Sequence, residues 1–306
     1  MPNKKLKEQI ALGALIALAA GFMTFLTRHG NMNPGSYVSP NIASSPALGT
    51  AGAALGFDRN DYPGDAALPE LRRTFSFSSF WLNSPPGEQS NSWAGKRGML
   101  EQSDFGFLVL FNGRGSKELK STARAVELGA SDARAAAESA AREGFGPGTI
   151  IFLDQEEGGR MLEEQKAYIY DWVDGVNSAG FRAGIYCSGM AVKDGGEEIV
   201  TARDIEENAH GRAIVFWIYN DACPPAPGCV YAPSVPAPSA SGFESAAVWQ
   251  FAQSPRRGEY TARCATTYDA DGNCYPPGAS GAGRMNLDLD SATTSDPSSA
   301  PSSARQ

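Results

Sequence analysis

The middle of the chain alternates short, continuously apolar runs with longer segments in which apolar residues recur at helical spacing. Apolar runs without polar alternation are typical of strands that are covered on both faces, as in a parallel sheet. Such runs occupy residues 105–113, 149–153, 181–188, 212–221 and 246–251. The pattern therefore predicts a series of strands with helical segments between some of them.

Two of the intervening segments predict helices. Residues 131–148 begin at Ser131, which is suited to capping a helix, and place alanines on one helix face before Gly144. Residues 163–178 carry aromatic and valine side chains on one side and end before Gly180. Strands separated by helices predict right-handed βαβ units, which form a closed barrel or an open, doubly wound sheet.

Composition divides the chain into four parts. Residues 1–31 predict a signal peptide or signal anchor, residues 32–54 a Gly-, Pro- and Ser-rich linker, and residues 293–306 a disordered tail. The remaining part, residues 55–292, has close to the ~250 residues typical of one (β/α)8 barrel. We therefore expect an α/β protein with a single TIM-barrel-like domain.

The N-terminus has the composition of an export signal. Lys4, Lys5 and Lys7 precede residues 10–26, which are apolar and uncharged. A membrane-spanning helix needs roughly 17–25 apolar residues, whereas a cleaved signal has an apolar region of about 7–15 residues. No clear Ala-x-Ala site follows the stretch. We expect an uncleaved anchor that holds the protein body outside the cytoplasm through residues 10–26. A cleaved signal, which gives a secreted protein, is the alternative.

Four of the five cysteines lie in loop-like sequence, Cys223 with Cys229 and Cys264 with Cys274. We expect two local disulfides, which suit an oxidising compartment, although four cysteines allow three connectivities. A four-cysteine zinc site is the alternative, but the usual two-residue ligand spacing is absent. The fifth cysteine, Cys187, is expected to be a buried, unreactive thiol.

Charge and histidine content exclude several function classes. The formal net charge is -8 and no basic cluster lies in the predicted domain, so nucleic acid is not an expected partner. Only two histidines are present, His29 and His210, which is too few for a multi-histidine metal site and weakens a Ser-His or Cys-His mechanism. We expect no metal and no cofactor. Carboxylates are the only abundant catalytic groups.

One predicted strand ends in a pair of carboxylates, Asp154 and Glu156. Residues i and i+2 of an extended chain point to the same face, about 6.6 Å apart. Two carboxylates so close cannot both ionise freely, so the pKa of one is raised and it can donate a proton near neutral pH. An acid beside a second anionic group is the requirement for hydrolysing a glycosidic bond. A solvated acidic loop is the simpler alternative.

Further aspartates lie near the two ends of the predicted barrel. Asp58 ends its first short strand, and Asp288 and Asp290 lie in its last. The first and last strands of a closed barrel are neighbours. We therefore expect Asp58 and Asp288 to converge on one mouth with Asp154 and Glu156.

Motifs in order along residues 55–292 carry a family resemblance. They include "GFDRNDYPGD", "GTIIFLDQE", "GIYCSG", "VWQFAQ" and "LDLDSA". Together they resemble the glycoside-hydrolase-like domain of unknown function found in bacterial secreted proteins. That domain is a relative of glycoside hydrolase family 25, the muramidase lysozymes. The resemblance implies a (β/α)8-like barrel with carboxylates at its C-terminal mouth.

The resemblance also implies residue roles. Glu156 would be the general acid, and Asp154 would assist, for example by holding the N-acetyl group of the substrate. Asp58 would line the opposite wall and Asp288 would complete the cluster. Sugar contacts would come from the strand-end residues Tyr186, Trp249 and Gln250.

The chain departs from the family pattern in two places. The closing motif there usually reads Asp-x-Asn, whereas here it reads Asp288-Leu-Asp290, which leaves open which aspartate faces inward. Residues 220–283 are long and irregular for a barrel connection and are expected to form a lid or rim.

The implied function is a secreted or membrane-anchored hydrolase that acts on peptidoglycan or a related amino-sugar polymer. Two alternatives are a non-catalytic glycan-binding module on a degenerate barrel and a structural envelope protein.

Overall fold

The computed structural model describes residues 52–299, apart from the side chain of Ala282. The predicted signal segment, most of the predicted linker and residues 300–306 lie outside these residues. The described residues belong to one compact unit, which spans Thr50–Gln306. None of the helices within residues 52–299 is long and apolar enough to cross a membrane.

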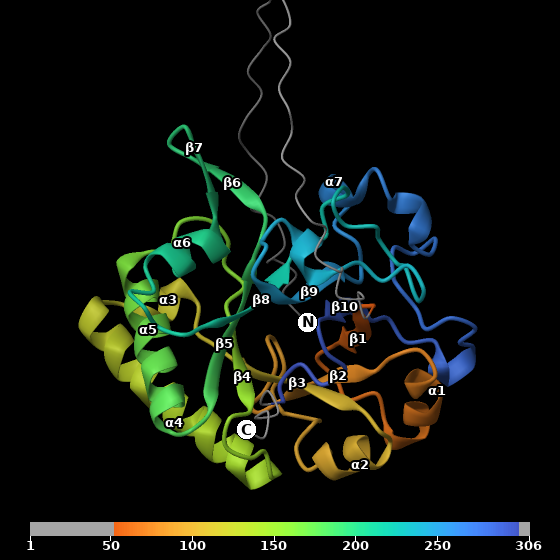
Figure 1. The fold of residues 1–306 in the computed structure, drawn as a ribbon, viewed down its shortest axis with the longest axis horizontal. Helices are drawn as coiled ribbons and strands as arrows, with labels where there is room; N and C mark the ends of the chain where they lie inside the picture. Colours follow the sequence, from red (N-terminus) through yellow and green to blue (C-terminus); the bar gives the residue numbers. More distant parts are fainter. Residues whose placement is uncertain (1–51, 300–306) are drawn as a thin grey trace, which may run out of the picture. The chain divides into compact units, whose positions relative to one another are not determined.

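Eight strands close into a barrel, which confirms the predicted TIM-barrel-like fold (Figure 1). In their order around the barrel they are β1 (Ala54–Asp58), β10 (Asp288–Ala292), β9 (Ala246–Ala252), β8 (Val215–Tyr219), β5 (Arg182–Ser188), β4 (Ile150–Asp154), β3 (Gly106–Asn112) and β2 (Phe77–Trp81). The five predicted apolar runs correspond to β3, β4, β5, β8 and β9. All residues of β2 and β4 are buried, as expected for strands covered on both faces.

Two long helices cover one side of the barrel, α4 (Thr122–Glu143) and α5 (Glu163–Ser178) (Figure 1). The two helices approach each other closely at Gly129 of α4. A Cβ atom at this position would lie only 2.6 Å from the carbonyl oxygen of Tyr168 of α5, so a larger residue would not fit. The predicted start of α4 at Ser131 is wrong. Its N-cap is Ser121, whose hydroxyl accepts a hydrogen bond from the Arg124 amide at 3.3 Å.

The remaining helices are short. They are α1 (Leu68–Arg72), α2 (Arg97–Gln102), α3 (Ser116–Leu119), α6 (Thr201–Glu207) and α7 (Gly258–Thr261), with 3-10 turns at Asp65–Ala67, Pro238–Ser241, Ala265–Thr267 and Gly281–Gly283. Long loops rather than long helices therefore join β8 to β9 and β9 to β10.

The last strand, β10, runs antiparallel to both of its neighbours, whereas all other neighbouring barrel strands are parallel. This differs from the parallel sheet that the sequence predicted. A parallel pair requires a crossover to the far end of the barrel. The loop after β9 instead stays at the mouth, so the chain enters β10 from there. Asp288 therefore begins its strand, paired with Asp58 at the end of β1.

A small hairpin follows β5 and rises from the same end of the barrel as α7 (Figure 1). It consists of β6 (Ala191–Asp194) and β7 (Glu197–Val200). Arg160 forms ion pairs with Asp194 at 2.9 Å and Glu197 at 2.7 Å, which connect the two hairpin strands to the loop after β4.

The prediction of a disordered tail from residue 293 is wrong for residues 293–299. Ser298 is buried, its hydroxyl accepts a hydrogen bond from the Val109 amide at 2.8 Å, and its carbonyl accepts one from the Ile150 amide at 2.8 Å. The Asp296 carboxylate accepts a third, from Phe107. These amides at the starts of β3 and β4 need acceptors, and the tail supplies them.

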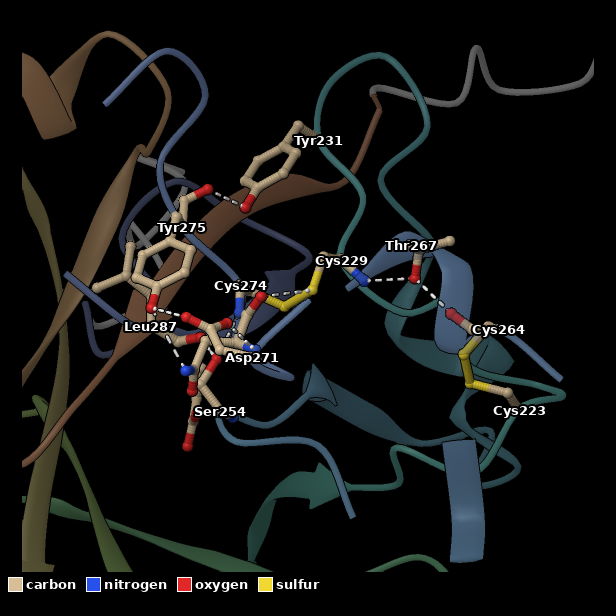
Figure 2. The surroundings of a disulfide bond; sticks show 12 residues. Cys223, Cys229, Tyr231, Ser254, Cys264, Thr267, Asp271, Cys274, Tyr275 and Leu287 are labelled. Carbon is tan, nitrogen blue, oxygen red and sulfur yellow. Dashed lines mark hydrogen bonds between the residues drawn. A yellow bond between two sulfur atoms is a disulfide. The ribbon is translucent and has the colours of Figure 1, made fainter. Parts of the chain in front are cut away.

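The predicted local pairing of the cysteines is also wrong. The disulfides join Cys223 to Cys264 and Cys229 to Cys274 (Figure 2). The loop after β8 runs beside the loop after β9, which brings the Cα atoms of these pairs to 5.7 and 5.4 Å. Each bridge therefore ties one loop to the other. Cys187 is free and fully buried, as predicted, and burial raises the pKa of its thiol.

Candidate active site

A cavity of about 320 Å³ opens at the mouth of the barrel, where the parallel strands end. Six of the seven predicted site residues line it, namely Asp58, Asp154, Glu156, Asp288, Tyr186 and Gln250. The long segment after β8 contributes Gln253, Ser254 and Pro255, so it forms part of the rim, as expected. The structure thus brings together carboxylates that lie up to 230 positions apart in the sequence.

Strand direction explains the convergence of the aspartates. Asp58 and Asp154 are the last residues of β1 and β4, and Asp288 is the first residue of the antiparallel β10. Glu156 lies two residues beyond the end of β4, where its carbonyl oxygen accepts a hydrogen bond from the Tyr219 hydroxyl at 2.9 Å. The loop that carries Glu156 is therefore fixed to the end of β8.

Asp154 has a buried carboxyl oxygen that forms no hydrogen bond within residues 52–299. Its residue is only 6% exposed, and its Oδ1 atom is buried without a hydrogen-bond partner among the described residues. Burial raises the pKa of Asp154 well above its ordinary value, and the neighbouring charges of Glu156 and Asp58 add to the effect. One oxygen of Asp154 is thus buried beside the cavity without a hydrogen bond from the described part of the chain.

Glu156 is exposed to solvent, in contrast to the buried aspartates around it. The walls of the cleft still remove part of its hydration, which raises the pKa of its carboxyl group. A carboxyl group with a raised pKa retains a proton closer to neutral pH. Glu156 is therefore the accessible member of the cluster that is best suited to donate one.

Asp58 is held by a chain of side-chain hydrogen bonds. The Gln250 amide donates to Asp58 at 2.7 Å, and the Tyr186 hydroxyl donates to Gln250 at 2.9 Å. Gln253 also donates to Gln250, at 2.8 Å. Burial raises the pKa of Asp58 to about 6, although its hydrogen bonds oppose the shift. Tyr186 and Gln250 therefore orient Asp58, besides lining the cavity.

Asp288 lies at the rim and accepts a hydrogen bond from the Ser254 amide at 2.6 Å. Burial, and then the charge of Asp58, raise its pKa well above the ordinary value. Asp290 lies two residues further along β10 and is fully buried. Both aspartates thus face the barrel interior, which settles the alternative that the sequence left open.

Asp290 is an additional member of the cluster. Its Oδ1 accepts a hydrogen bond from Trp217 Nε1 at 3.0 Å, while its Oδ2 has no amide or hydroxyl donor within the described part of the chain. Asp290 is instead hydrogen-bonded to Asp58, and a bond between two carboxyl groups requires one proton. Burial raises the pKa of Asp290 well above its ordinary value. Asp290 and Asp58 therefore share one proton. Its i+2 spacing from Asp288 was the available sequence signal.

The predicted sugar contact from Trp249 is wrong. Successive strand residues point to opposite faces, so Gln250 faces the cavity while Trp249 points away from it. Trp249 is fully buried, and its ring N–H donates to the Asn220 carbonyl at 2.9 Å. The tryptophans that line the cavity are Trp81 and Trp217. The sequence run of β2, which contains Trp81, mixes serine with aromatic residues and was not recognised as a strand.

The arrangement combines an accessible proton donor, Glu156, with less exposed aspartates. Together these aspartates hold fewer protons than there are carboxyl groups. Such a set can protonate a leaving oxygen and stabilise positive charge that develops beside it. Within residues 52–299, no group of three or more His, Cys, Asp or Glu side chains has the geometry of a metal site.

Comparison with protein families and solved structures agrees with this architecture. The model of the Rv2525c-like, glycoside hydrolase-like domain family matches residues 94–223. No curated protein sequence matches the chain significantly. An uncharacterized protein of B. stearothermophilus has a similar fold, with a TM-score of 0.50 and 20% identity over 78% of this chain and 95% of that one.

Two weaker structural matches are enzymes by name. The spore cortex lytic enzyme SleM of Clostridium perfringens has a TM-score of 0.47 and 14% identity, over 82% of this chain and 69% of that one. A family 25 glycosyl hydrolase from Bacillus anthracis has a TM-score of 0.43 and 12% identity, over 78% and 88%. Over residues 94–223 the chain thus matches the Rv2525c-like, glycoside hydrolase-like family, which confirms the resemblance predicted from its motifs.

Proposed function

We propose that the barrel is a glycoside hydrolase that cleaves peptidoglycan or a related amino-sugar polymer, with Glu156 as its general acid. The observation that carries this proposal is the position of Glu156, exposed at a cavity whose other carboxyl groups are buried (Asp58 and Asp154) or half-buried (Asp288). The match to a glycoside hydrolase-like family model supports the reaction class.

In the proposed reaction Glu156 protonates the leaving oxygen, because it combines solvent access with a raised pKa. Asp154, which lines the same cavity, would accept a hydrogen bond from the N-acetyl N–H of the substrate. Asp58, held by Gln250 and by the proton that it shares with Asp290, supplies negative charge at the opposite wall. Trp81 and Trp217 border the cavity but are themselves buried, so they shape its walls rather than offer a broad stacking surface.

Location belongs to the same proposal. Two disulfides indicate an oxidising compartment outside the cytoplasm. Export through residues 1–31, with residues 10–26 as an anchor or a cleaved signal, would bring the barrel to a cell-wall polymer.

The test measures reducing ends released from purified peptidoglycan by the full-length protein and by its Glu156→Gln variant. We expect the variant to lose about 10²–10⁴-fold in rate, the usual contribution of a general acid. Glu138→Gln is the matched control, because Glu138 is exposed on α4, away from the cavity. Absence of activity in every protein, together with retained glycan binding, would contradict the proposal and favour the non-catalytic binding module.

A further inference from the structure

A second pocket, of about 280 Å³, adjoins the active-site cavity. The two share Asp58, Asn60, Ser254 and Asp288, and the second pocket adds Arg59, Asp61 and Asn286. We call it the side pocket. Every residue that lines it is polar. A ligand that fills it must therefore be hydroxylated or charged.

Arg59 is the only cationic residue that lines the side pocket. Its Nε–H is buried and donates no hydrogen bond within residues 52–299. Burial lowers the pKa of the Arg59 guanidinium, while the charges of Asp61 and Asp288 act to raise it, and the group stays charged because arginine is so strongly basic. Buried donors without acceptors are rare, and such a group calls for a ligand or a functional reason.

The backbone holds Arg59 firmly in place. Its amide donates to the Ser79 hydroxyl at 3.2 Å, and its carbonyl accepts from Trp81 Nε1 at 3.1 Å. Both partners belong to β2. The root of the Arg59 side chain is therefore fixed at the end of β1, directly beside Asp58.

Two other arginines near the mouth behave differently. Arg114 Nε donates to the buried Asp132 at 2.6 Å, and Arg257 Nε donates to the fully buried Asp221 at 3.0 Å. Each of these guanidinium groups is neutralised within the fold. Arg59 alone among the three keeps its planar set of donors for a ligand.

We propose that the side pocket binds a carboxylate carried by the glycan, with the Arg59 guanidinium as its counter-ion. This inference rests on the proposed function, because it deepens the substrate class of the same cleft. A carboxylate accepts two parallel hydrogen bonds from a guanidinium, whereas a neutral hydroxyl leaves the partly desolvated charge uncompensated. The pocket then selects acidic amino-sugar polymers over neutral ones.

The carboxyl groups around Arg59 are compatible with an anionic ligand. Burial, and then the charge of Asp58, raise the pKa of Asp288 well above its ordinary value, which weakens the repulsion between Asp288 and a bound carboxylate. Asp61 is exposed, and its charge opposes the lowering of the Arg59 pKa by burial, although it accepts no hydrogen bond from the buried Nε–H. A bound carboxylate thus gains the positive charge without displacing an existing partner.

The experiment compares two glycans that differ only in charge. Peptide-free peptidoglycan strands carry carboxylates, and the same strands after chemical reduction of the carboxyl groups carry alcohols. Binding is measured by calorimetry on the Glu156→Gln background, so the readout does not depend on hydrolysis. We expect carboxylated strands to bind at least tenfold more tightly than reduced strands, and Arg59→Ala to abolish that difference. Arg59→Lys is expected to retain part of it.

Arg134→Ala is the matched control, since Arg134 is exposed on α4 and the substitution removes the same charge. An equal loss of affinity for both strands in Arg59→Ala, or no loss for either, would overturn the inference. Thermal melting of each variant shows whether an equal loss comes from misfolding, and Arg59→Lys then decides the question. In the parent protein, inactivity on both strands with a preserved charge preference would contradict only the hydrolase proposal.

Discussion

Strands β3, β4 and β5 lie beside the long helices α4 and α5, whereas β8, β9 and β10 are joined by loops that two disulfides tie together. Both halves contribute to one mouth. The helical half supplies Asp154 and leads into Glu156, and the disulfide half supplies Gln250, Ser254 and Asp288. The position of the proposed acid, Glu156, is therefore stabilised by packed helices. The opposite wall of the cavity is stabilised by disulfide bonds.

The difference separates two physical strategies for holding a side chain. The helical half buries a large apolar surface, and such burial is the main stabilising force in folding. The loops of the disulfide half have fewer regular hydrogen bonds, and cross-links compensate by restricting the unfolded chain. Substitutions in the helical half should therefore change the rate of the proposed reaction. Substitutions in the disulfide half should change the shape of the cleft.

The largest expected effect is on the helical half. Asp154→Asn should lower kcat/KM on peptidoglycan by about 10²-fold or more, because it removes a charge beside the proposed acid. It should also raise the Tm at pH 7, since the buried carboxyl group loses its cost of ionisation. Initial rates and melting curves check both. A variant that lost stability together with activity would show that Asp154 is mainly structural.

Removing one bridge should affect the other half. The double variant Cys229→Ala, Cys274→Ala opens a cross-link with a sequence separation of 45 residues, and we expect a loss of about 2–4 kcal/mol in the free energy of unfolding. Hydrogen exchange should rise in residues 220–287 and stay unchanged in α4 and α5. Equal loss of protection in both halves would contradict the division. Cys187→Ala serves as the control for removing a cysteine that forms no bridge.

A smaller effect, on the pH dependence of stability, is expected from a substitution in β10, the strand of the disulfide half that pairs with β1. Asp58 and Asp290 bind protons more tightly in the folded state, so stability is highest below their unfolded pKa near 4 and falls as the pH rises. Asp290→Asn keeps a donor toward Asp58 and an acceptor for Trp217 without ionising. It should raise the Tm at pH 8 by roughly 2–4 °C for each 1 kcal/mol gained, and have less effect at pH 4.

The activity of the same variant sharpens this prediction. Asp290→Asn should stay active, because its amide donates a hydrogen bond to Asp58 in place of the shared proton, whereas Asp290→Leu should lose activity along with that hydrogen bond. Reducing-end assays of the two variants at one pH distinguish these cases. Loss of activity in Asp290→Asn would mean that ionisation of Asp290 itself is required.

Much of the helical half was predictable from its sequence, because long apolar runs and helical periodicity are local signals. The strands β3, β4 and β5 and the helix α5 follow directly from them. Asp154 and Glu156 could be placed at the mouth for the same reason, since they follow a buried strand.

The disulfide half depends on contacts between distant residues, which local patterns do not encode. The alternation of Leu and Asp at the start of β10 is identical for a strand in either direction, so it could not reveal the antiparallel pairing. The connectivity of the cysteines depends on two loops running side by side. The role of Trp249 depended on which face of β9 points inward, and the packing of residues 293–299 depended on unpaired amides of β3 and β4.

The antiparallel direction of β10 also determines where other molecules can be joined to the barrel. Ala54, at the start of β1, pairs with Ala292, at the end of β10, while Asp58 and Asp288 pair at the mouth. Both connections to the barrel therefore lie beneath it, separated from the carboxylates by roughly 13–17 Å of strand. A reporter domain or solid support attached at either connection is expected to leave the mouth unobstructed, so the proposed hydrolysis of an insoluble polymer could be assayed with the protein immobilised.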